Sequence, residues 1–141
     1  MKRILLIEDS GDVSYDIKND LNNCNCEIKF ADSYLSAKGM WRRYNGEFDC
    51  IILDLNINPE GLTPEESSKF FPTIGLTFLI NINWDENLAK KVKLIIYSAY
   101  ITEFKVKCSQ NNIDYSGIVL VEKSGTNFYK LIKDIKSIME D

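Results

Sequence analysis

The sequence predicts an α/β fold in which helices cover both faces of a doubly wound parallel sheet. Two observations lead to this fold class: five short apolar runs recur along the chain, and segments with helical spacing lie between them. Strands and helices that alternate in one chain imply right-handed β-α-β crossovers and parallel strands. Ligands of such sheets bind beyond the carboxyl ends of the strands, so the residues at those ends are the informative ones.

The five expected strands are short and mostly rich in Ile, Leu and Val. The first, third, fourth and fifth are nearly continuous in these residues, which is typical of strands covered on both faces. The second alternates more and is therefore expected at an edge of the sheet. The expected strands span residues 3–7, 27–31, 49–53, 93–97 and 118–121.

The segments between the strands have the periodicity of helices. Val13, Ile17 and Leu21 repeat every four residues, and Ser33 is a suitable N-cap for the next series. The last segment carries the clearest apolar stripe and is predicted to be a helix packed on the sheet. The residues of this stripe are Phe128, Leu131, Ile132, Ile135, Ile138 and Met139.

Length and composition fit a single globular domain over residues 1–141. The apolar share of 45% suffices for one core, and a second folded domain does not fit. The net charge is −4 and the basic residues are scattered, so a protein or a small ion is expected as partner rather than nucleic acid or an anionic membrane. The apolar run near Met1 is too short for a signal peptide or a membrane span, so a cytoplasmic location is expected.

The chain contains four cysteines and no histidine. Because there is no C-x-x-C pair, reduced and mostly buried thiols are expected rather than a structural zinc site. The lack of histidine removes the usual general base and the usual nitrogen carrier of a phosphoryl group. If the protein handles phosphate, it must receive the phosphate on oxygen.

Three carboxylates follow two of the expected strands. Glu8 and Asp9 come directly after the first strand, and Asp54 comes directly after the third. Neighbouring carboxylates repel one another and need a cation, and a few hard oxygen ligands are what Mg²⁺ prefers. Acidic residues also end strands because turns favour them, but three at the ends of apolar strands weaken that alternative.

A hydroxyl and an ammonium are expected at the same edge of the sheet. Ser98 ends the fourth strand and Lys123 follows the fifth. Taken singly, each is more typical of a solvated surface. Together with the carboxylates and a metal ion, they describe a pocket for a phosphoryl group.

This ordered set of motifs resembles the CheY-like receiver domain of two-component response regulators. The motifs are ILLIEDS at 4–10, IILDL at 51–55, LIIYSA at 94–99 and VEK at 121–123. The resemblance covers the chain apart from one insertion and implies a flavodoxin-like five-stranded sheet of order 2-1-3-4-5. It implies a stand-alone phosphoprotein of a phosphorelay, which catalyses only its own phosphorylation and dephosphorylation.

The resemblance also implies the partners and the metal ligands. Asp54 would accept a phosphoryl group from a histidine kinase or a phosphotransfer protein, and the altered surface would signal to a downstream protein target. Asp9, Asp54 and the backbone carbonyl of Asn56 would ligate Mg²⁺ directly, and Glu8 would do so through water. Positioning and charge neutralisation then supply nearly all of the catalysis.

Two further roles and two departures follow from the same resemblance. Ser98 would donate a hydrogen bond to one phosphoryl oxygen, and Lys123 would pair with another. The family couples movement of this hydroxyl to an aromatic residue on the fifth strand, where this chain has Leu120. Tyr100 either supplies the aromatic bulk from the neighbouring loop or is a half-exposed packing residue. Ser124 stands where the family commonly has Pro, so no cis bond is expected there.

Residues 56–74 do not fit a compact alternation of strands and helices. The stretch contains three prolines and the pair Phe70-Phe71, and it is long for a strand-to-helix connection. It is interpreted as an insertion on the strand-end face, after which Gly75 resembles the start of the family's third helix. Either it is a lid beside Asp54 or a tolerated surface excursion. Packing of Phe70 and Phe71 over the site would favour the lid.

Two other functions remain as alternatives. A pseudo-receiver would keep the fold but act as a protein-interaction module without phosphate, which the intact set of acidic, hydroxyl and ammonium residues disfavours. A small flavin- or nucleotide-binding enzyme would need a phosphate-cradling loop after the first strand. The sequence EDSGD at 8–12 is too acidic for that without a metal.

Overall fold

A five-stranded parallel sheet forms the centre of the computed structural model, which describes residues 1–140. The strand order is β2-β1-β3-β4-β5, and all four pairings are parallel. This confirms the predicted fold class and strand order, including the second strand at an edge. The strands are β1 (Lys2–Ile7), β2 (Cys26–Ala31), β3 (Cys50–Leu53), β4 (Lys93–Ser98) and β5 (Val119–Glu122).

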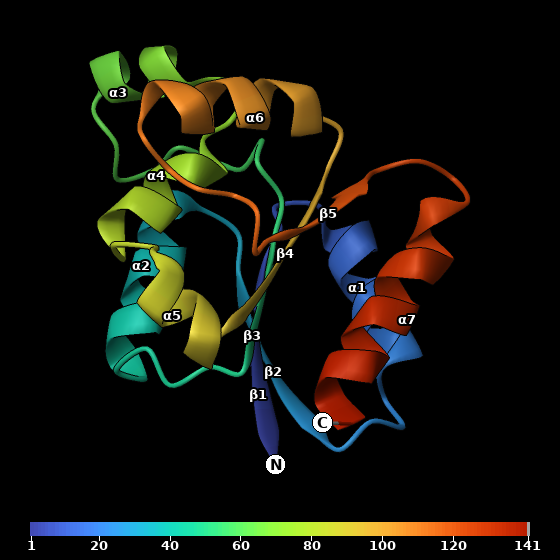
Figure 1. Ribbon diagram of the computed structural model, residues 1–141. Helices are drawn as coiled ribbons and strands as arrows, with labels where there is room; N and C mark the ends of the chain where they lie inside the picture. The colour runs from blue at the N-terminus through green and yellow to red at the C-terminus, as the bar shows by residue number, and fades with distance from the viewer. Residues whose placement is uncertain (141) are drawn as a thin grey trace.

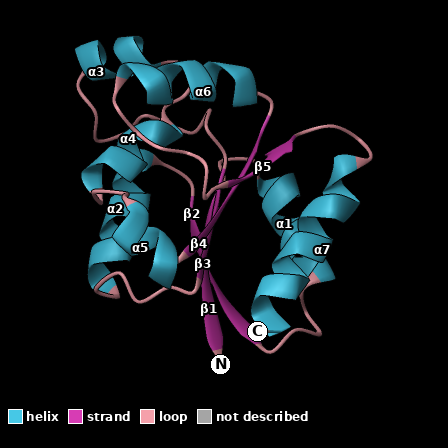
Figure 2. Cartoon of the chain, viewed as in Figure 1, coloured by secondary structure: helices cyan, strands magenta, loops and turns pink. Residues whose placement is uncertain are grey.

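Helices cover both faces of this sheet, as Figures 1 and 2 show. Helices α1 and α7 lie side by side on one face, and the other helices lie on the opposite face or at the strand-end edge. Within residues 1–140, no helix combines the length and the apolar character needed to cross a bilayer. The helices are α1 (Gly11–Asp20), α2 (Tyr34–Arg43), α3 (Pro64–Phe70), α4 (Gly75–Asn81), α5 (Glu86–Lys91), α6 (Ile101–Gln110) and α7 (Asn127–Glu140).

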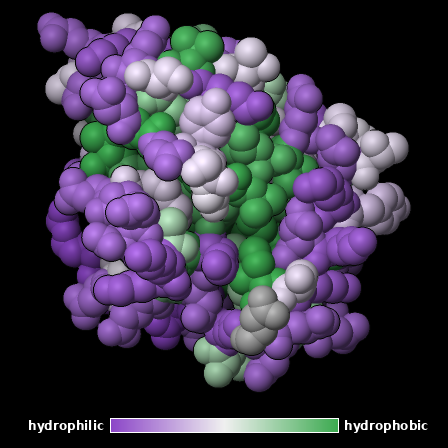
Figure 3. All heavy atoms as spheres, in the orientation of Figure 1, coloured by the Kyte–Doolittle hydropathy of each residue, from purple (hydrophilic) through white to green (hydrophobic). Residues whose placement is uncertain are grey.

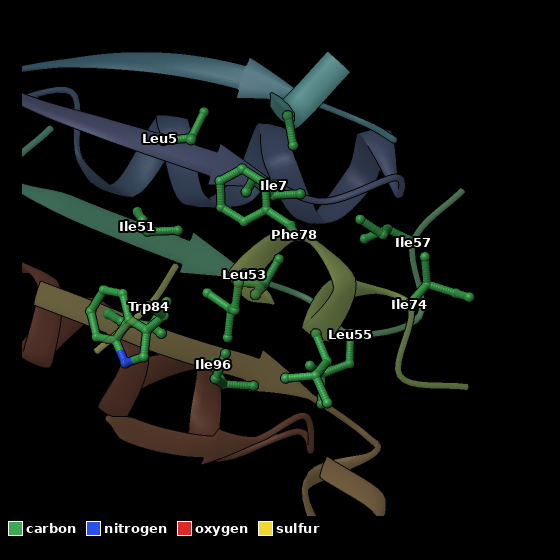
Figure 4. Close-up of a cluster of buried hydrophobic side chains, with 14 of the residues drawn as sticks. Leu5, Ile7, Ile51, Leu53, Leu55, Ile57, Ile74, Phe78, Trp84 and Ile96 are labelled. Atoms are coloured by element: carbon green, nitrogen blue, oxygen red, sulfur yellow. The ribbon is translucent and has the colours of Figure 1, made fainter. Parts of the chain in front are cut away.

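Two apolar cores, one on each face, account for the continuous apolar strands. In β1, Leu5 and Ile7 point into the larger core, whereas Ile4 and Leu6 point into the smaller core beneath α1 and α7. Successive side chains of a strand alternate between faces, so a strand covered on both sides must be apolar at every position. Figure 4 shows the larger core, with Phe78 of α4 lying over β1.

The edge strand β5 is less completely covered than the central strands. Val119 is 36% exposed, while Val121 is buried in the smaller core. Figure 3 shows the corresponding apolar area over β5, between α6 and α7. The strand is apolar, as predicted, but part of it faces solvent.

All four cysteines are free thiols. Cys50 and Cys108 are fully buried, and burial raises the pKa of each thiol to about 12. Cys24 and Cys26 are partly buried beside the smaller core. The buried pair therefore stays protonated and serves as small apolar packing residues.

The first part of the segment between β3 and α3 caps the start of α2. The first N–H groups of a helix have no partner within the helix. Here Tyr34 N–H donates to the carbonyl of Asn58 (3.0 Å), and Leu35 N–H donates to that of Glu60 (2.9 Å). Ser33 supplies the next cap, because its hydroxyl accepts from the N–H of Ser36. The first half of the 56–74 segment thus completes a helix of the core.

The second half of this segment forms α3, which is fixed at both ends. Thr63 and Glu66 form a reciprocal capping box at its start. At its end, Phe70 is buried in the larger core, and Nζ of Lys107 on α6 donates to the carbonyl of Lys69 (2.9 Å). The segment is therefore part of the folded body, joined to both α2 and α6.

Candidate metal and phosphoryl site

The backbone of the sheet places Glu8 and Asp54 next to each other. The N–H of Glu8 donates to the carbonyl of Ala31 on β2, and the N–H of Asp54 donates to that of Ile7 on β1, both at 2.9 Å. Ile7 also pairs with Leu53 in the register of β1 and β3. Hydrogen bonding between the strands thus continues one residue past their ends, and the two acids come to the same edge.

The structure groups the three carboxylates that the sequence singled out. One oxygen each from Glu8, Asp9 and Asp54 lie within 4.8 Å of one another. Glu8 and Asp54 are buried, whereas Asp9 is exposed and opens the group to solvent. A compact set of carboxylate oxygens with a solvent-facing side fits Mg²⁺, which retains several waters. The carbonyl of Asn56 stays a predicted fourth ligand.

Lys123 is the cation of this cluster. Its Nζ donates to Oε1 and Oε2 of Glu8 and to Oδ2 of Asp54, each at 3.1 Å. The main chain of Lys123 is held by β4, because its N–H donates to the carbonyl of Ser98 at 3.0 Å. The predicted arrival of Lys123 at the acidic edge is thus observed. Its two contacts with Glu8 were not predicted.

The charges of the cluster do not balance. Three carboxylates and one ammonium carry −3 and +1, which leaves −2 in formal charge. Burial and the neighbouring Asp54 raise the pKa of Glu8 to about 7, although Lys123 opposes the shift. Partial burial and Asp54 also raise the pKa of Asp9. Burial opposes the charged form of Lys123, but Asp54 and Glu8 outweigh it and raise the pKa of the ammonium.

Both carboxylate oxygens of Asp54 have a fixed donor. Oδ1 accepts from the N–H of Leu55 at 2.7 Å, and Oδ2 accepts from Lys123. Helix α4 lies directly against this backbone, since the N–H of Gly75 donates to the carbonyl of Leu55 at 2.7 Å. A Cβ at Gly75 would lie only 2.6 Å from the carbonyl oxygen of Asp54. The start of α4 and the candidate acceptor residue are therefore packed backbone against backbone.

Ser98 stands at the same edge but is engaged with its own chain. It is completely buried, and its hydroxyl accepts a hydrogen bond from the N–H of Tyr100 at 3.2 Å. Within residues 1–140 this hydroxyl makes no hydrogen bond to Asp54. The proton of the hydroxyl is left to donate, because the N–H of Tyr100 uses only an acceptor site.

The two candidate switch residues lie on one face of the sheet. Tyr100 and Leu120 are both partly buried against the larger core, and Leu120 pairs with Ile96 in the β4–β5 register. A second aromatic residue, Tyr97, lies on the other face, and Nζ of Lys123 is 5.5 Å from its ring centroid. Sequence reasoning missed Tyr97. Because side chains alternate between the two faces of a strand, the sequence could have shown that Tyr97 points to the face opposite Ile96.

Phe70 and Phe71 do not act as a pair over the site. Phe70 is buried in the larger core, whereas Phe71 is 64% exposed. The packing of both rings that would favour a lid is therefore not observed. Neither is the segment a loose excursion, since it caps α2 and contributes Phe70 to the core.

Comparison by sequence and by structure gives different results. No protein-family model matches the sequence, and no curated protein matches it either. Many solved structures match the fold. One is the non-phosphorylated HemR receiver domain from Leptospira biflexa, with a TM-score of 0.67 and 16% identity over 100% of this chain and 96% of that chain.

Two further similar structures are response regulators. The phosphorylated cyanobacterial phytochrome response regulator RcpA matches with a TM-score of 0.64 and 23% identity, over 99% of this chain and 91% of that chain. The Mn(2+)-bound form of response regulator Rcp1 matches with a TM-score of 0.63 and 21% identity, over 98% and 91%. The chain therefore has the CheY-like fold of response regulator receiver domains over nearly its whole length.

Proposed function

We propose that this protein is a response-regulator receiver that accepts a phosphoryl group on Asp54 in a Mg²⁺-dependent reaction. The observation that carries the proposal is the group of three carboxylate oxygens within 4.8 Å, with Lys123 bonded to two of the residues. A fold alone does not establish a function, because one fold hosts many. Here the fold and the chemistry of the strand-end residues favour the same activity.

The proposed reaction transfers the phosphoryl group from nitrogen to oxygen. A carboxylate oxygen of Asp54 forms a bond to phosphorus while the phosphorus–nitrogen bond of a phosphohistidine breaks. The imidazole nitrogen leaves with the electron pair, and the product is an acyl phosphate on Asp54. The donor is a histidine kinase or a phosphotransfer protein, since this chain has no histidine of its own.

The residues around Asp54 position its carboxylate and neutralise charge. The Leu55 N–H and Lys123 hold the two oxygens of Asp54 in a fixed orientation. When bound by Glu8, Asp9, Asp54 and the Asn56 carbonyl, Mg²⁺ supplies positive charge to the transferring oxygens. The Mn(2+)-bound and phosphorylated states named for two similar structures support this assignment.

The signal is proposed to pass through Ser98. Its hydroxyl proton is free to donate to a phosphoryl oxygen, and the hydroxyl already touches the N–H of Tyr100. A shift of Ser98 therefore displaces the first residue before α6, and Tyr100 and Leu120 repack on the same face. The altered surface is read by a downstream protein target. We place these events in the cytoplasm, where Mg²⁺ and kinases are available.

Intact mass after incubation with acetyl phosphate tests the proposal. We expect the wild-type protein to gain the mass of one phosphoryl group in the presence of Mg²⁺ and not in the presence of a chelator. Asp54→Asn should gain nothing, because the amide is not a nucleophile of comparable strength. Asp32→Asn is the matched control: it removes a nearby exposed carboxylate that lies outside the cluster and should retain the mass gain.

A second measurement separates the receiver from a pseudo-receiver. Beryllofluoride mimics an acyl phosphate without needing a reactive donor. With Mg²⁺ and beryllofluoride, the receiver should show amide resonance shifts around Ser98, Tyr100 and α6. Unchanged spectra, together with no mass gain from acetyl phosphate, would favour a phosphate-independent interaction module.

A further inference from the structure

A cavity of about 370 Å³ lies between the start of α5 and the connection from α6 to β5. It shares no lining residue with the candidate metal and phosphoryl site. Figure 4 shows Trp84, which lines the cavity, well separated from Leu55, which directly follows Asp54. The cavity is therefore a separate feature of the molecule, and its volume is within the range of ligand sites.

The two walls of the cavity have the same local design. Each follows a helix, begins with an asparagine at a φ of 57° and continues with an apolar residue and an aspartate. The positive φ turns the chain away from the helix. The apolar residue then packs in or against the larger core, whereas the aspartate is exposed. The two walls are Asn83-Trp84-Asp85 after α4 and Asn112-Ile113-Asp114 after α6.

Backbone hydrogen bonds hold both aspartates in place. Oδ1 of Asp85 accepts from the N–H of Leu88 at 2.8 Å, and Oδ1 of Asp114 accepts from the N–H of Ser116 at 2.9 Å. Each carboxylate keeps its second oxygen for a ligand, in an orientation that is fixed before the ligand arrives. Glu86 adds a third carboxylate, and no Lys or Arg of residues 1–140 lines the cavity, so its lining has a formal charge of −3.

Trp84 supplies an unpaired hydrogen-bond donor in the wall of this acidic cavity. The residue is only 9% exposed, yet no hydrogen bond within residues 1–140 uses its indole N–H. No fully buried side-chain nitrogen or oxygen in this part of the chain lacks a partner. The indole nitrogen of Trp84 therefore still contacts solvent, and it does so in the cavity that Trp84 lines. An almost buried donor of this kind favours a ligand with an acceptor.

The donor and the acids together indicate the chemistry of the ligand. Within residues 1–140, the only group of three or more acids close enough to hold one metal ion is the one at the strand-end edge of the sheet. The acids of the cavity therefore suit an extended organic cation rather than a metal ion. The indole N–H requires a neutral acceptor in addition, such as a carbonyl. A peptide with a basic side chain offers both groups, whereas a free polyamine offers only the charge.

We propose that this cavity binds a basic peptide segment of a partner protein. An arginine or lysine side chain of the segment lies between Asp85 and Asp114, and a carbonyl of its backbone accepts from the indole N–H of Trp84. Arginine suits the site best, because its planar fork of donors can reach two carboxylates at once. The binding does not need Asp54, so the peptide should bind Asp54→Asn as it binds the wild type.

Titration of the wild-type protein with the peptide acetyl-Gly-Arg-Arg-Gly-amide, followed by amide and indole NMR resonances, tests the proposal. We expect the indole N–H resonance of Trp84 and the amide resonances of residues 112–117 to shift. The chain has two tryptophans, and the other one, Trp41, packs on Phe48 and Phe78 and should keep its resonance in place. An unmoved Trp84 resonance overturns the proposal. So do shifts confined to the acidic cluster at the strand-end edge.

Two further ligands separate charge from shape and a peptide from a free cation. The same peptide with citrulline in place of arginine keeps the carbonyls and loses the charge, and it should bind about fivefold more weakly. Spermidine carries charge without a carbonyl and should leave the indole resonance of Trp84 in place. Equal binding of the citrulline peptide would contradict the role of charge. If spermidine moves the Trp84 resonance as far as the arginine peptide does, the site takes a free cation and the assignment to a peptide is wrong.

The variants Asp85→Asn and Asp114→Asn test the two walls. An amide oxygen can still accept the backbone hydrogen bond that each aspartate makes, so the local structure is kept while the charge is lost. Each variant should weaken binding of the arginine peptide about two- to fivefold. Asp20→Asn is the matched control, because it removes an exposed carboxylate at the end of α1, on the other face of the sheet, and should leave binding unchanged. Equal losses in all three variants would mean that net charge acts at long range, which contradicts binding in the cavity.

Discussion

Gly75 is a residue whose lack of a side chain is required by the site. A Cβ there would lie 2.6 Å from the carbonyl oxygen of Asp54 and 3.1 Å from a methyl carbon of Leu53. The first of these neighbours is the backbone of the residue after β3, whose N–H is hydrogen-bonded to Ile7 of β1, so it has little freedom to move. Helix α4 must therefore retreat if residue 75 carries a side chain, and its hydrogen bond to the carbonyl of Leu55 is strained.

We predict that Gly75→Ala lowers the free energy of unfolding by about 1 to 3 kcal/mol, as overpacking in a core does. Gly39→Ala is the matched control, because Gly39 lies inside α2 and a Cβ there meets nothing within 4 Å. That change should stabilise the protein by about 0.5 to 1 kcal/mol. Urea unfolding measures both. Equal effects of the two variants would contradict the close approach at Gly75.

Glu8 gives the metal-free protein a distinctive pH dependence. Its pKa is raised from 4.5 to about 7, mainly by burial and by Asp54. Between these values the native state binds a proton on Glu8 that the unfolded chain does not bind. The contribution of Glu8 to the stability of the metal-free protein is therefore fully present below pH 4.5 and is lost as the pH rises through about 7.

We predict that Glu8→Gln removes this loss, because an amide is neutral at every pH. In a chelator, the variant should be more stable than the wild type at pH 8 by about 1 to 3 kcal/mol, with little difference near pH 4. Urea unfolding at a series of pH values measures the difference. The raised pKa would be contradicted if, between pH 5 and pH 7, the unfolding free energy of the wild type rose relative to that of the variant by about 1 kcal/mol or more.

At the scale of elements, the segment between β3 and α4 belongs to the core. Phe70, at the end of α3, is buried in the larger core, while the adjacent Phe71 is 64% exposed. We predict that Phe70→Ala lowers the unfolding free energy by about 3 to 5 kcal/mol. Phe71→Ala should change it by no more than about 0.5 kcal/mol. Thermal or urea unfolding distinguishes the two, and a mild effect of Phe70→Ala would mean that α3 is only loosely attached.

The elements differ in how far the sequence predicts them. Strands β1 and β3 were found almost to the residue, because full burial on both faces leaves an uninterrupted apolar run. Helix α3 was not predicted, although Thr63-Pro64-Glu65-Glu66 carries the capping-box pattern and a proline at the first helical turn. Prolines and a glycine nearby favoured a loop instead. Its stability comes from Phe70 and Lys107, which are contacts distant in sequence.

The features of the candidate site also differ in how far the sequence predicts them. Glu8, Asp9 and Asp54 were predicted to converge because parallel strands carry their carboxyl ends to one edge, which depends on topology alone. The double contact between Lys123 and Glu8 was not predicted. Several carboxylate oxygens lie near the ammonium, and small differences in distance and burial decide which of them it contacts. The spacing of motifs in the sequence predicts neither.

At the scale of the whole molecule, the net negative charge of the Glu8, Asp9, Asp54 and Lys123 cluster is coupled to the stability of the fold. The cluster joins side chains that follow β1, β3 and β5, so its residues come together only in the folded sheet. Any ligand that binds the native cluster and not the unfolded chain stabilises the whole domain. Mg²⁺ at about one hundred times its dissociation constant should add about 2.7 kcal/mol.

We therefore predict that Mg²⁺ raises the Tm of the wild-type protein and that a chelator reverses the rise. Asp54→Asn should lose most of this response, because it removes one of three grouped carboxylates. Asp32→Asn should keep it, since Asp32 is outside the group although its charge acts on Asp9.

Because a protonated Glu8 is a poor ligand, the rise in Tm should also grow as the pH increases through about 7. Scanning calorimetry measures all of these, and a Mg²⁺ response that survives in Asp54→Asn would place the metal elsewhere on the molecule.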